Sequence, residues 1–423
     1  MKIGVCADTH IGRRIPRAIG ELRREAYRHS FTQAINVFIE EDVDCLIHAG
    51  DVFEKRSMTP EDSVFVKDEL QRLVDSIHEK NGKDVVMFAL RGNHDGTPET
   101  NALDYIRHPL AQYLKLIGDN ILQGKEEAYT QGRLRLVGIG YHPYISQRFQ
   151  DIKPLVENSF RGDSDLRILA VHNFIRGYHQ IPPGVPEHNM YAVSDFESIQ
   201  ADFIVSGHYH TKKEPSRENG KTLLTPGATE AVDLSDEGPY GVYILEEDRT
   251  ARFIPIKPLH DIRNVKLTSE GAVKPTDWFV ENALKEAESY ASSLQTSASQ
   301  GVLRIVLSGL TDGDPYAVEP ALMPRFAALE QASPQLLHIE LVSRLENVRQ
   351  TVALPALGGG VEYAAEILEP LGEATREGMK IVEEVGNILD EKASQRTGLL
   401  TGSDRTPFVK RWTELLEAEK AST

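Results

Sequence analysis

The sequence predicts a mixed α/β sandwich followed by a smaller α/β unit and a helical C-terminal segment. Short apolar runs of strand composition alternate with segments whose apolar residues recur at helical spacing, and a strand-rich stretch runs from Lys221 to Ile256. At 423 residues and 40% hydrophobic composition, the chain is too long for one typical core. We therefore expect one domain over residues 1–260, a second over 261–350, and a linker with helices over 351–423.

The strands of the first domain stop at polar residues. The apolar runs Lys2–Ala7, Cys45–Ala49 and Val85–Leu90 each end at glycine or at carboxylate, amide or imidazole side chains. A buried strand that ends in this way is typical of an active-site loop. Further strands are predicted over residues 134–141, 166–171 and 203–206, and the last two end at histidines.

Helices are predicted between these strands. Apolar residues recur at helical spacing from Tyr27 to Ile39. Thr59 is a capping hydroxyl, Pro60 occupies the first helical position, and an apolar stripe follows from Phe65 to Ile77. Residues 103–114 have the pattern of short helices divided at a proline.

The second domain is predicted as a small βα unit. Three consecutive glycines, at 358–360, are hard to fit inside a helix or strand and predict a linker. Beyond them, Thr406 and Pro407 begin an amphipathic helix containing Trp412, and the linker favours a helix that docks on a partner over one packed on its own chain. Within the unit, helices are expected at 278–290 and 322–329, strands at 302–307 and 336–342, and a Ser/Gln-rich connection at 291–301.

The composition argues against several classes of protein. No apolar run approaches the roughly 20 residues needed to span a bilayer, and the first apolar run stops at Asp8, so we expect neither a membrane protein nor a signal peptide. A net charge of -17 argues against binding nucleic acid by bulk charge, so any such contact must come from a local patch or a partner. Cys6 and Cys45 show no metal-binding spacing, and we interpret them as buried free thiols of a cytoplasmic protein.

Seven metal-capable side chains fall at predicted strand ends. Strand ends on one side of a sheet converge in space, so we expect these side chains to meet. Seven mixed nitrogen and oxygen ligands are enough for two metals, and they suit manganese, iron or zinc better than calcium or magnesium. Two ions about 3.5 to 4 Å apart would activate a water and stabilise the attacking and leaving oxygens of a phosphate ester. The seven residues are Asp8, His10, Asp51, Asn93, His172, His208 and His210.

Taken one at a time, these residues carry little information. A single histidine after a strand is usually an ordinary core or surface residue, and an aspartate after glycine is usually part of a turn. Five separate apolar runs that each end in metal-capable side chains are not what turns alone produce, and this recurrence favours a metal site. The other histidines lack the pattern and are interpreted as ordinary, namely His29, His48, His78, His108, His142, His179, His188, His260 and His338.

Five short motifs resemble those of the calcineurin-like metallophosphoesterases. They are Asp8-Thr9-His10, Gly50-Asp51, Gly92-Asn93-His94-Asp95, His172 and Gly207-His208-Tyr209-His210. The resemblance implies an α/β/β/α sandwich in which Asp8, His10 and His210 hold one metal. By the same resemblance Asn93, His172 and His208 hold the other metal, and Asp51 bridges the two. It also implies that His94 protonates the leaving oxygen or stabilises the transition state.

Within that superfamily, the N-terminal start, residues 48–53 and the domain order resemble the SbcD-type DNA-repair nucleases of the Mre-eleven family. This resemblance implies a metal-dependent exonuclease and endonuclease in double-strand-break repair, with DNA and a Rad-fifty or SbcC ATPase as partners. We expect two divalent ions, with manganese preferred. A homodimer is also implied, with Phe65–Ile77 and Leu103–Leu114 as candidate helices. A capping domain matching Trp278–Val342 and a C-terminal helical segment that docks on the ATPase complete the expectation.

Two residues depart from the pattern of these nucleases. Arg91 precedes the Gly-Asn-His-Asp motif, as in the protein-phosphatase branch, where that arginine holds the substrate phosphate. Glu54 stands where some of these nucleases carry a histidine that assists the residue matching His94. Both departures leave the substrate preference and the support of His94 open.

Three arginines follow the first motif. Arg13, Arg14 and Arg17 lie within a few residues' reach of the metals, and we predict that they contact DNA phosphates flanking the scissile one. The simpler interpretation is that they balance an acidic surface. Two other functions stay open: a small-substrate phosphodiesterase or phosphatase, and a non-catalytic scaffold for the ATPase. The residues beyond 264 argue against the first, and the complete ligand set argues against the second.

Overall fold

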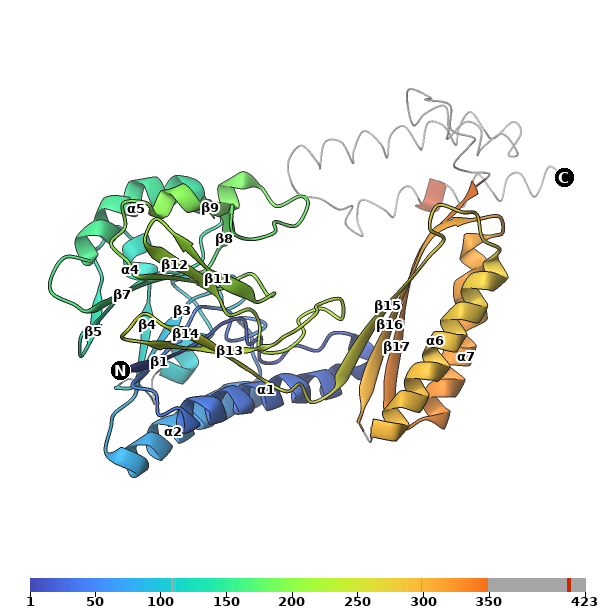
Figure 1. The fold of residues 1–423 in the computed structure, drawn as a ribbon, viewed down its shortest axis with the longest axis horizontal. Coiled ribbons are helices and arrows are strands. Elements are labelled where there is room, and N and C mark those ends of the chain that lie inside the picture. The colour runs from blue at the N-terminus through green and yellow to red at the C-terminus, as the bar shows by residue number, and fades with distance from the viewer. Residues whose placement is uncertain (108–109, 111, 298, 349–408, 412–423) are drawn as a thin grey trace, which may run out of the picture.

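Two stacked sheets with helices on both outer faces form the first part of the molecule, and a three-stranded sheet with two helices forms the second (Figure 1). This arrangement confirms the predicted α/β/β/α sandwich with a smaller α/β unit. The structure is a computed structural model that describes residues 1–107, 110, 112–297, 299–348 and 409–411. The predicted linker at 358–360 and all but three residues of the terminal helix, together with His108, lie outside the described residues.

The first sheet collects the N-terminal motifs at one edge. Its strand order is β14-β13-β1-β2-β3-β4, and β1 to β4 run parallel. Because parallel strands bring their carboxyl ends to the same edge, the residues that follow β1, β2 and β3 meet there. The strands are β1 (Lys2–Cys6), β2 (Cys45–His48), β3 (Val86–Leu90), β4 (Leu114–Ile117), β13 (Gly241–Glu246) and β14 (Ala251–Pro255).

The second sheet brings in the later histidines. Its order is β11-β12-β10-β7-β6-β5, and β6, β7, β10 and β12 are parallel to their neighbours in that series. The strands are β5 (Tyr129–Gln131), β6 (Leu134–Ile139), β7 (Leu166–Val171), β10 (Phe203–Ser206), β11 (Lys213–Glu218) and β12 (Lys221–Thr225). A short separate pair, β8 (Phe174–Arg176) and β9 (Met190–Ala192), follows β7.

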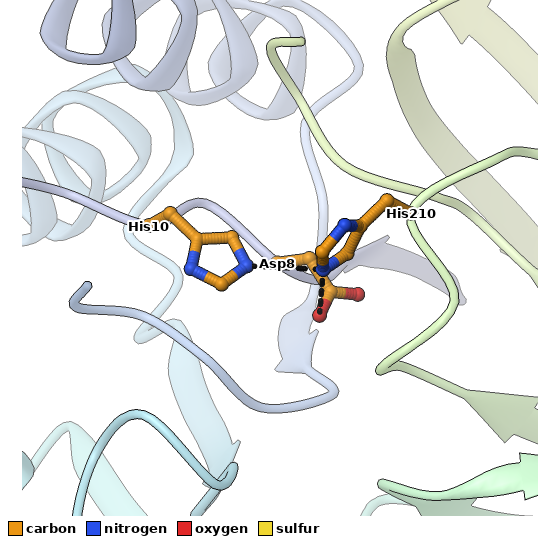
Figure 2. A group of neighbouring side chains, drawn as sticks. All are labelled: Asp8, His10 and His210. Atoms are coloured by element: carbon orange, nitrogen blue, oxygen red, sulfur yellow. Dashed lines mark hydrogen bonds and ion pairs between the residues drawn. The ribbon is translucent and has the colours of Figure 1, made fainter. Parts of the chain in front are cut away.

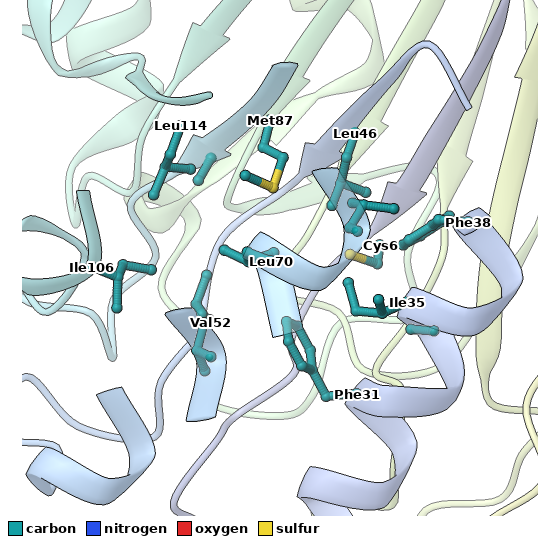
Figure 3. Packing of buried hydrophobic residues seen from close by; sticks show 14 of the residues in the cluster. Cys6, Phe31, Ile35, Phe38, Leu46, Val52, Leu70, Met87, Ile106 and Leu114 are labelled. Carbon is teal, nitrogen blue, oxygen red and sulfur yellow. The ribbon is translucent and has the colours of Figure 1, made fainter. Parts of the chain in front are cut away.

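Three apolar layers hold the sandwich together. Phe88 and Phe203 are among the residues buried between the two sheets. On the outer face of the first sheet, α1 (Gly20–Glu40), α2 (Pro60–Asn81) and α3 (Leu103–Arg107) bury a second layer, in which Figure 3 shows Phe38 of α1 packed near Cys6 of β1. The third layer lies between the second sheet and α4 (Asp119–Leu122) with α5 (Ile145–Ser159). The sequence motifs therefore sit on loops anchored by a core on each side.

Thr59 begins α2 as the predicted cap. Its Oγ1 accepts a hydrogen bond from the Asp62 N–H at 3.2 Å and another from the Arg24 guanidinium at 3.0 Å. Pro60 follows at the first helical position, where the missing N–H costs nothing. Local cap chemistry was therefore sufficient to place this helix start.

The apolar stripe of α2 belongs to the core of its own chain. Leu70, Leu73, Val74 and Ile77 are buried, and so are Leu103 and Ile106 of α3. The buried part of this stripe is covered within one chain, so a homodimer surface on these helices, which stays a prediction, would have to use their other residues. The exposed large apolar residues on these two helices are Val64 and Tyr105, which are 50% and 70% exposed.

Two predicted boundaries also differ from the structure. Leu114 begins strand β4 instead of continuing a helix, because Leu114 and Ile117 are buried in the sandwich beside β3. The predicted connection at 291–301 is helical as far as Ser297. Ala291 and Leu294 continue the buried face of α6, so tertiary burial overrides the weak helix preference of the surrounding serines.

The second unit is a parallel sheet backed by two helices. Its strands β15 (Asp261–Thr268), β16 (Gly301–Thr311) and β17 (Leu336–Asn347) lie in that order. One face is covered by α6 (Thr276–Ser297) and α7 (Val318–Ala332), and the other face is turned toward the sandwich (Figure 1). A small cluster of Ile19, Leu234 and Val302 joins the two parts.

The two cysteines, Cys6 and Cys45, are buried free thiols, as predicted. Burial raises the pKa of both thiols, so neither is a reactive thiolate. Across the described part of the chain, no helix combines the length and apolar character needed to cross a membrane.

Candidate metal centre

Loops that follow five strands bring the seven predicted ligands together at one edge of the sandwich. Each loop begins where a buried strand ends, so the positions of the side chains are fixed by the packed sheets behind them. Asp8 and His10 follow β1, Asp51 follows β2, Asn93 follows β3, His172 follows β7, and His208 and His210 follow β10.

Asp8, His10 and His210 form the first group of potential ligands (Figure 2). His10 Nε2 lies 3.3 Å from His210 Nε2, which in turn lies 4.0 Å from Asp8 Oδ1. His10 Nδ1 is 3.1 Å from the carboxylate of Glu54. A carboxylate only accepts hydrogen bonds, so Nδ1 carries the hydrogen and Nε2 turns a lone pair toward the group.

The second group contains Asn93, His172 and His208. His172 Nδ1 donates to the Ala49 carbonyl at 2.6 Å, which turns Nε2 into the site. That Nε2 lies 3.3 Å from Asn93 Oδ1 and 3.2 Å from Asp51 Oδ2. Potential ligand atoms of Asp51, His172 and His208 all lie within 4.8 Å of one another.

Asp51 stands between the two groups. Its Oδ2 is 3.2 Å from His172 Nε2 and 3.9 Å from His10 Nε2. This oxygen is buried, and among the described residues it makes no hydrogen bond of normal geometry, so its close contacts are these two imidazole nitrogens. A buried carboxylate needs compensating positive charge, and a cation placed between the two groups would supply it. The donor set therefore fits divalent metal ions, with Asp51 facing both groups.

Buried charges at the site are paired closely. Burial alone would lower the pKa of His172, but the adjacent Asp51 raises it to about 9. Burial alone would raise the pKa of Asp51, but His172 holds it well below its usual range. Burial raises the pKa of Asp8 to about 7, although His172 opposes this. A divalent ion bound by both Asp51 and His172 would take the place of their pairing.

Four of the seven residues have left-handed backbone. The φ angles are 52° at Asp8, 43° at His10, 57° at Asp51 and 71° at His208. Non-glycine residues rarely adopt this region, at a cost of order 1–3 kcal/mol each, and such conformations cluster at functional sites. The Asp8 and His10 N–H groups donate to the carbonyls of Gly50 and Asp51 at 3.0 and 3.1 Å, which ties the first two loops together.

Asp95 fastens the loops of β2 and β3 to each other. Its carboxylate accepts hydrogen bonds from the N–H groups of Asp51 at 2.9 Å, Phe53 at 3.0 Å and Gly92 at 3.0 Å. A Cβ at Gly92 would overlap the Asp51 carboxylate, so the loop requires glycine at this position. Sequence reasoning included Asp95 in a motif but missed this role.

His94 lies at the rim of the site. Its Nδ1 is 2.8 Å from the backbone carbonyl of Glu54, which only accepts, so Nδ1 carries the hydrogen and Nε2 is the atom left to act. Its backbone N–H donates to Asp51 Oδ1 at 2.8 Å, and its side chain is 33% exposed. With Nδ1 held in this way, Nε2 can donate a proton when the ring is an imidazolium. The approach of His94 to His10 and Asp51 also allows it to be a metal ligand.

The predicted arginine cluster divides in the structure. Arg13 donates to the Val232 carbonyl at 2.6 Å and to Glu54 at 2.8 Å, and its side chain is 12% exposed. These contacts use two of its five N–H donors inside the protein, and a contact of Arg13 with DNA stays a prediction. Arg14 and Arg17 are exposed and line a cavity of about 710 Å³ that reaches Glu54.

Arg91 is also committed to the fold. Its guanidinium binds the Asp119 carboxylate at 3.0 Å and the carbonyls of Gly96 and Tyr141, each at 3.0 Å. The residue is 6% exposed. This side chain therefore holds three segments of the fold together.

His179, which sequence reasoning treated as ordinary, supports the turn that carries His208 and His210. Its Nδ1 accepts from the Ile175 N–H at 2.9 Å, its Nε2 donates to Thr225 Oγ1 at 2.8 Å, and its ring stacks on Tyr209 at 4.5 Å. Burial lowers the pKa of His179 to about 3. No sequence signal marks this residue, because its partners are a backbone group and a distant threonine.

Acid should destabilise the protein through His179. An unfolded histidine titrates near pH 6.5 and the folded one near 3, so below about pH 6.5 the unfolded state binds a proton that the folded state does not. Stability is therefore lost as the pH falls, by up to about 1.4 kcal/mol per pH unit. His179→Gln should flatten the pH dependence of the unfolding free energy by that slope, and His78→Gln, at an exposed position, should not. Urea denaturation between about pH 7.5 and 5 measures the unfolding free energy of each variant. If the unfolding free energies of His179→Gln and the wild type change with pH in parallel, His179 does not cause the loss of stability in acid.

Comparison with known proteins supports the chemistry of this site. Residues 1–212 match a family described as calcineurin-like phosphoesterase. A "DNA double-strand break repair protein Mre11" of Methanosarcina mazei is 24% identical over 244 residues, which are 56% of this chain and 35% of that protein. The protein of the same name from Saccharolobus solfataricus is 26% identical over 247 residues, 57% of this chain and 58% of that one. An "Uncharacterized metallophosphoesterase YhaO" of Bacillus subtilis is 22% identical over 302 residues, 70% and 67% of the two chains. The match thus spans only about a third to two thirds of these relatives' own length.

Proposed function

This chain belongs to the calcineurin-like phosphoesterase family, and from that premise we propose that it is a dimetal DNA nuclease of double-strand-break repair. The observation that carries the proposal is the buried Asp51 Oδ2, which faces an imidazole nitrogen of each of the two groups of ligands. The names of the Methanosarcina and Saccharolobus relatives support DNA as the substrate. We further propose manganese as the metal, because the mixed imidazole, carboxylate and amide donors suit it.

The chain's own residues divide the work. Asp8, His10 and His210 would hold one ion and Asn93, His172 and His208 the other, with Asp51 shared. When bound, two such ions activate a water and stabilise the attacking and leaving oxygens of the phosphate. His94 as an imidazolium, with Nδ1 donating to a backbone carbonyl, would give its Nε2 proton to the leaving oxygen and return to the neutral ring.

DNA would approach along the exposed arginines. Arg14 and Arg17 follow the first metal motif and face solvent, so they can contact phosphates that flank the scissile one. We also propose a cytoplasmic complex with a Rad-fifty or SbcC-type ATPase and with a second copy of this chain. A homodimer would use residues outside the buried stripe of α2.

The substrate class is tested with purified protein and Mn²⁺, offered linear duplex DNA, single-stranded DNA and a chromogenic phosphodiester. We expect cleavage of DNA that a chelator abolishes. Cleavage of the small diester alone would replace the nuclease with the small-substrate phosphodiesterase.

Arg14→Ala combined with Arg17→Ala should weaken DNA binding similarly for all sequences. The slope of log affinity against log salt should flatten by roughly 0.9 for each lost duplex phosphate contact. Hydrolysis of the chromogenic diester should be nearly unchanged, because it has no flanking phosphates. An unaltered salt slope would show that these arginines do not contact DNA.

A further inference from the structure

Glu54 touches the metal centre and the proton donor at the same time. Its side-chain Oε2 is 3.1 Å from His10 Nδ1, and its backbone carbonyl is 2.8 Å from His94 Nδ1. Both contacts are to acceptors, so each ring carries its hydrogen on Nδ1 and turns Nε2 into the site. A single residue therefore sets the tautomer and the direction of two imidazoles that follow different strands.

Arg13 holds Glu54 in this position. Its NH1 donates to Glu54 Oε1 at 2.8 Å, and its Nε donates to the Val232 carbonyl at 2.6 Å. The side chains of Arg13 and Glu54 are each 12% exposed, so the pair is largely shielded from solvent and salt. The rigid fork of the guanidinium fixes both contacts, and the two oxygens of Glu54 serve different partners.

We propose that Glu54 and Arg13 are a positioning pair that orients His10 toward the first metal ion. The proposal deepens the proposed function, because it concerns the same metal site, and it is argued from the ligand geometry. A carboxylate that accepts from the far nitrogen of a metal-binding histidine fixes the ring and raises its basicity. Loss of such a partner typically weakens metal affinity by roughly 10- to 100-fold.

Glu54→Gln is the informative variant. An amide offers one acceptor oxygen and one donor group, so it can satisfy His10 or Arg13 but not both. Mn²⁺ binding to the chelator-treated full chain, followed by calorimetry, should show the first site weakened by roughly 10- to 100-fold and the second site unchanged. Arg13→Ala should weaken the same site by a smaller factor, because Glu54 is then free to turn away.

Two matched controls separate positioning from loss of a charge. Glu61 is 74% exposed and pairs with Arg24, and Arg107 is 52% exposed and pairs with Asp104. Glu61→Gln and Arg107→Ala should bind Mn²⁺ like the wild type. If Glu54→Gln does not fold, Mn²⁺ binding is measured with Glu54→Asp and Arg13→Lys instead. Each of these variants keeps the charge of the side chain and alters its length, so weaker binding at the first site is again the expected result.

The outcomes are distinct. A folded Glu54→Gln that binds Mn²⁺ as tightly as the wild type overturns the proposal, as does a loss of thermal stability with unchanged Mn²⁺ affinity. If the wild type does not cleave DNA while Glu54→Gln still binds Mn²⁺ weakly, the nuclease function fails and the role of Glu54 toward His10 stands.

Discussion

Asp51→Asn should leave the folded protein unable to retain two metal ions and should lower phosphodiester hydrolysis by about 10³-fold or more. Asp51 Oδ2 faces both ligand groups, at 3.2 Å from His172 Nε2 and 3.9 Å from His10 Nε2. The asparagine has nearly the same shape, so the change removes mainly the shared charge. Metal ions of this kind contribute several kcal/mol of transition-state stabilisation, which corresponds to the expected loss of rate.

Metal analysis after gel filtration in Mn²⁺ is the decisive measurement for this variant. His210→Asn, which removes a ligand from one group only, should keep one ion. Asp68→Asn, at an exposed position on α2, should keep two ions and full activity. Two ions retained by Asp51→Asn would show that Asp51 does not bridge the groups.

His94→Ser should lower the rate of DNA hydrolysis by roughly 10²- to 10⁴-fold while the metal content stays normal. The reason is that Nδ1 of His94 donates to the Glu54 carbonyl, so the imidazolium form has its Nε2 proton free at the rim to give to the leaving oxygen. The same variant should lose much less with a nitrophenyl diester, because a nitrophenolate leaves readily without a proton. A difference between the two substrates is expected only if His94 acts on the leaving oxygen.

The alternative for His94 is metal ligation, since its ring lies near His10 and Asp51. An equal loss of metal and activity in His94→Ser would establish that alternative. His78→Ser, at an exposed position on α2, is the control for loss of a histidine that lies on a helix surface.

The potential ligands were predictable because each one follows the end of an apolar run, and the local sequence is enough to predict where a strand ends. The helix start at Thr59 was predictable for the same reason, since the residue that donates to the Thr59 side chain is only three positions away. The internal contacts of Arg13 were not predictable, because one acceptor is a backbone carbonyl 219 residues away, and a backbone carbonyl is present at every position of the sequence. Glu54 was recognised as unusual, but its contact with His10 spans 44 residues and needed the folded loops to be seen.

The apolar stripe of α2 shows another limit of prediction from the sequence. Its spacing correctly predicted a helix with one apolar face, but spacing carries no information on what covers that face. The structure places α1, α2 and α3 against one sheet, and the buried positions of α2 are filled by this contact. A partner surface and an internal core have the same pattern in sequence, and only the three-dimensional arrangement separates them.

The contact between His10 and His210 joins two points 200 residues apart in the chain. A ribosome adds about 5–20 residues per second, so roughly 10–40 s separate the emergence of these two histidines during translation. Throughout that interval the nascent chain exposes an incomplete ligand set. The second sheet must dock on the first before the two loops meet, and such long-range closure is a slow step in folding. Hydrolytic activity therefore requires both that synthesis has passed residue 210 and that the two sheets have docked.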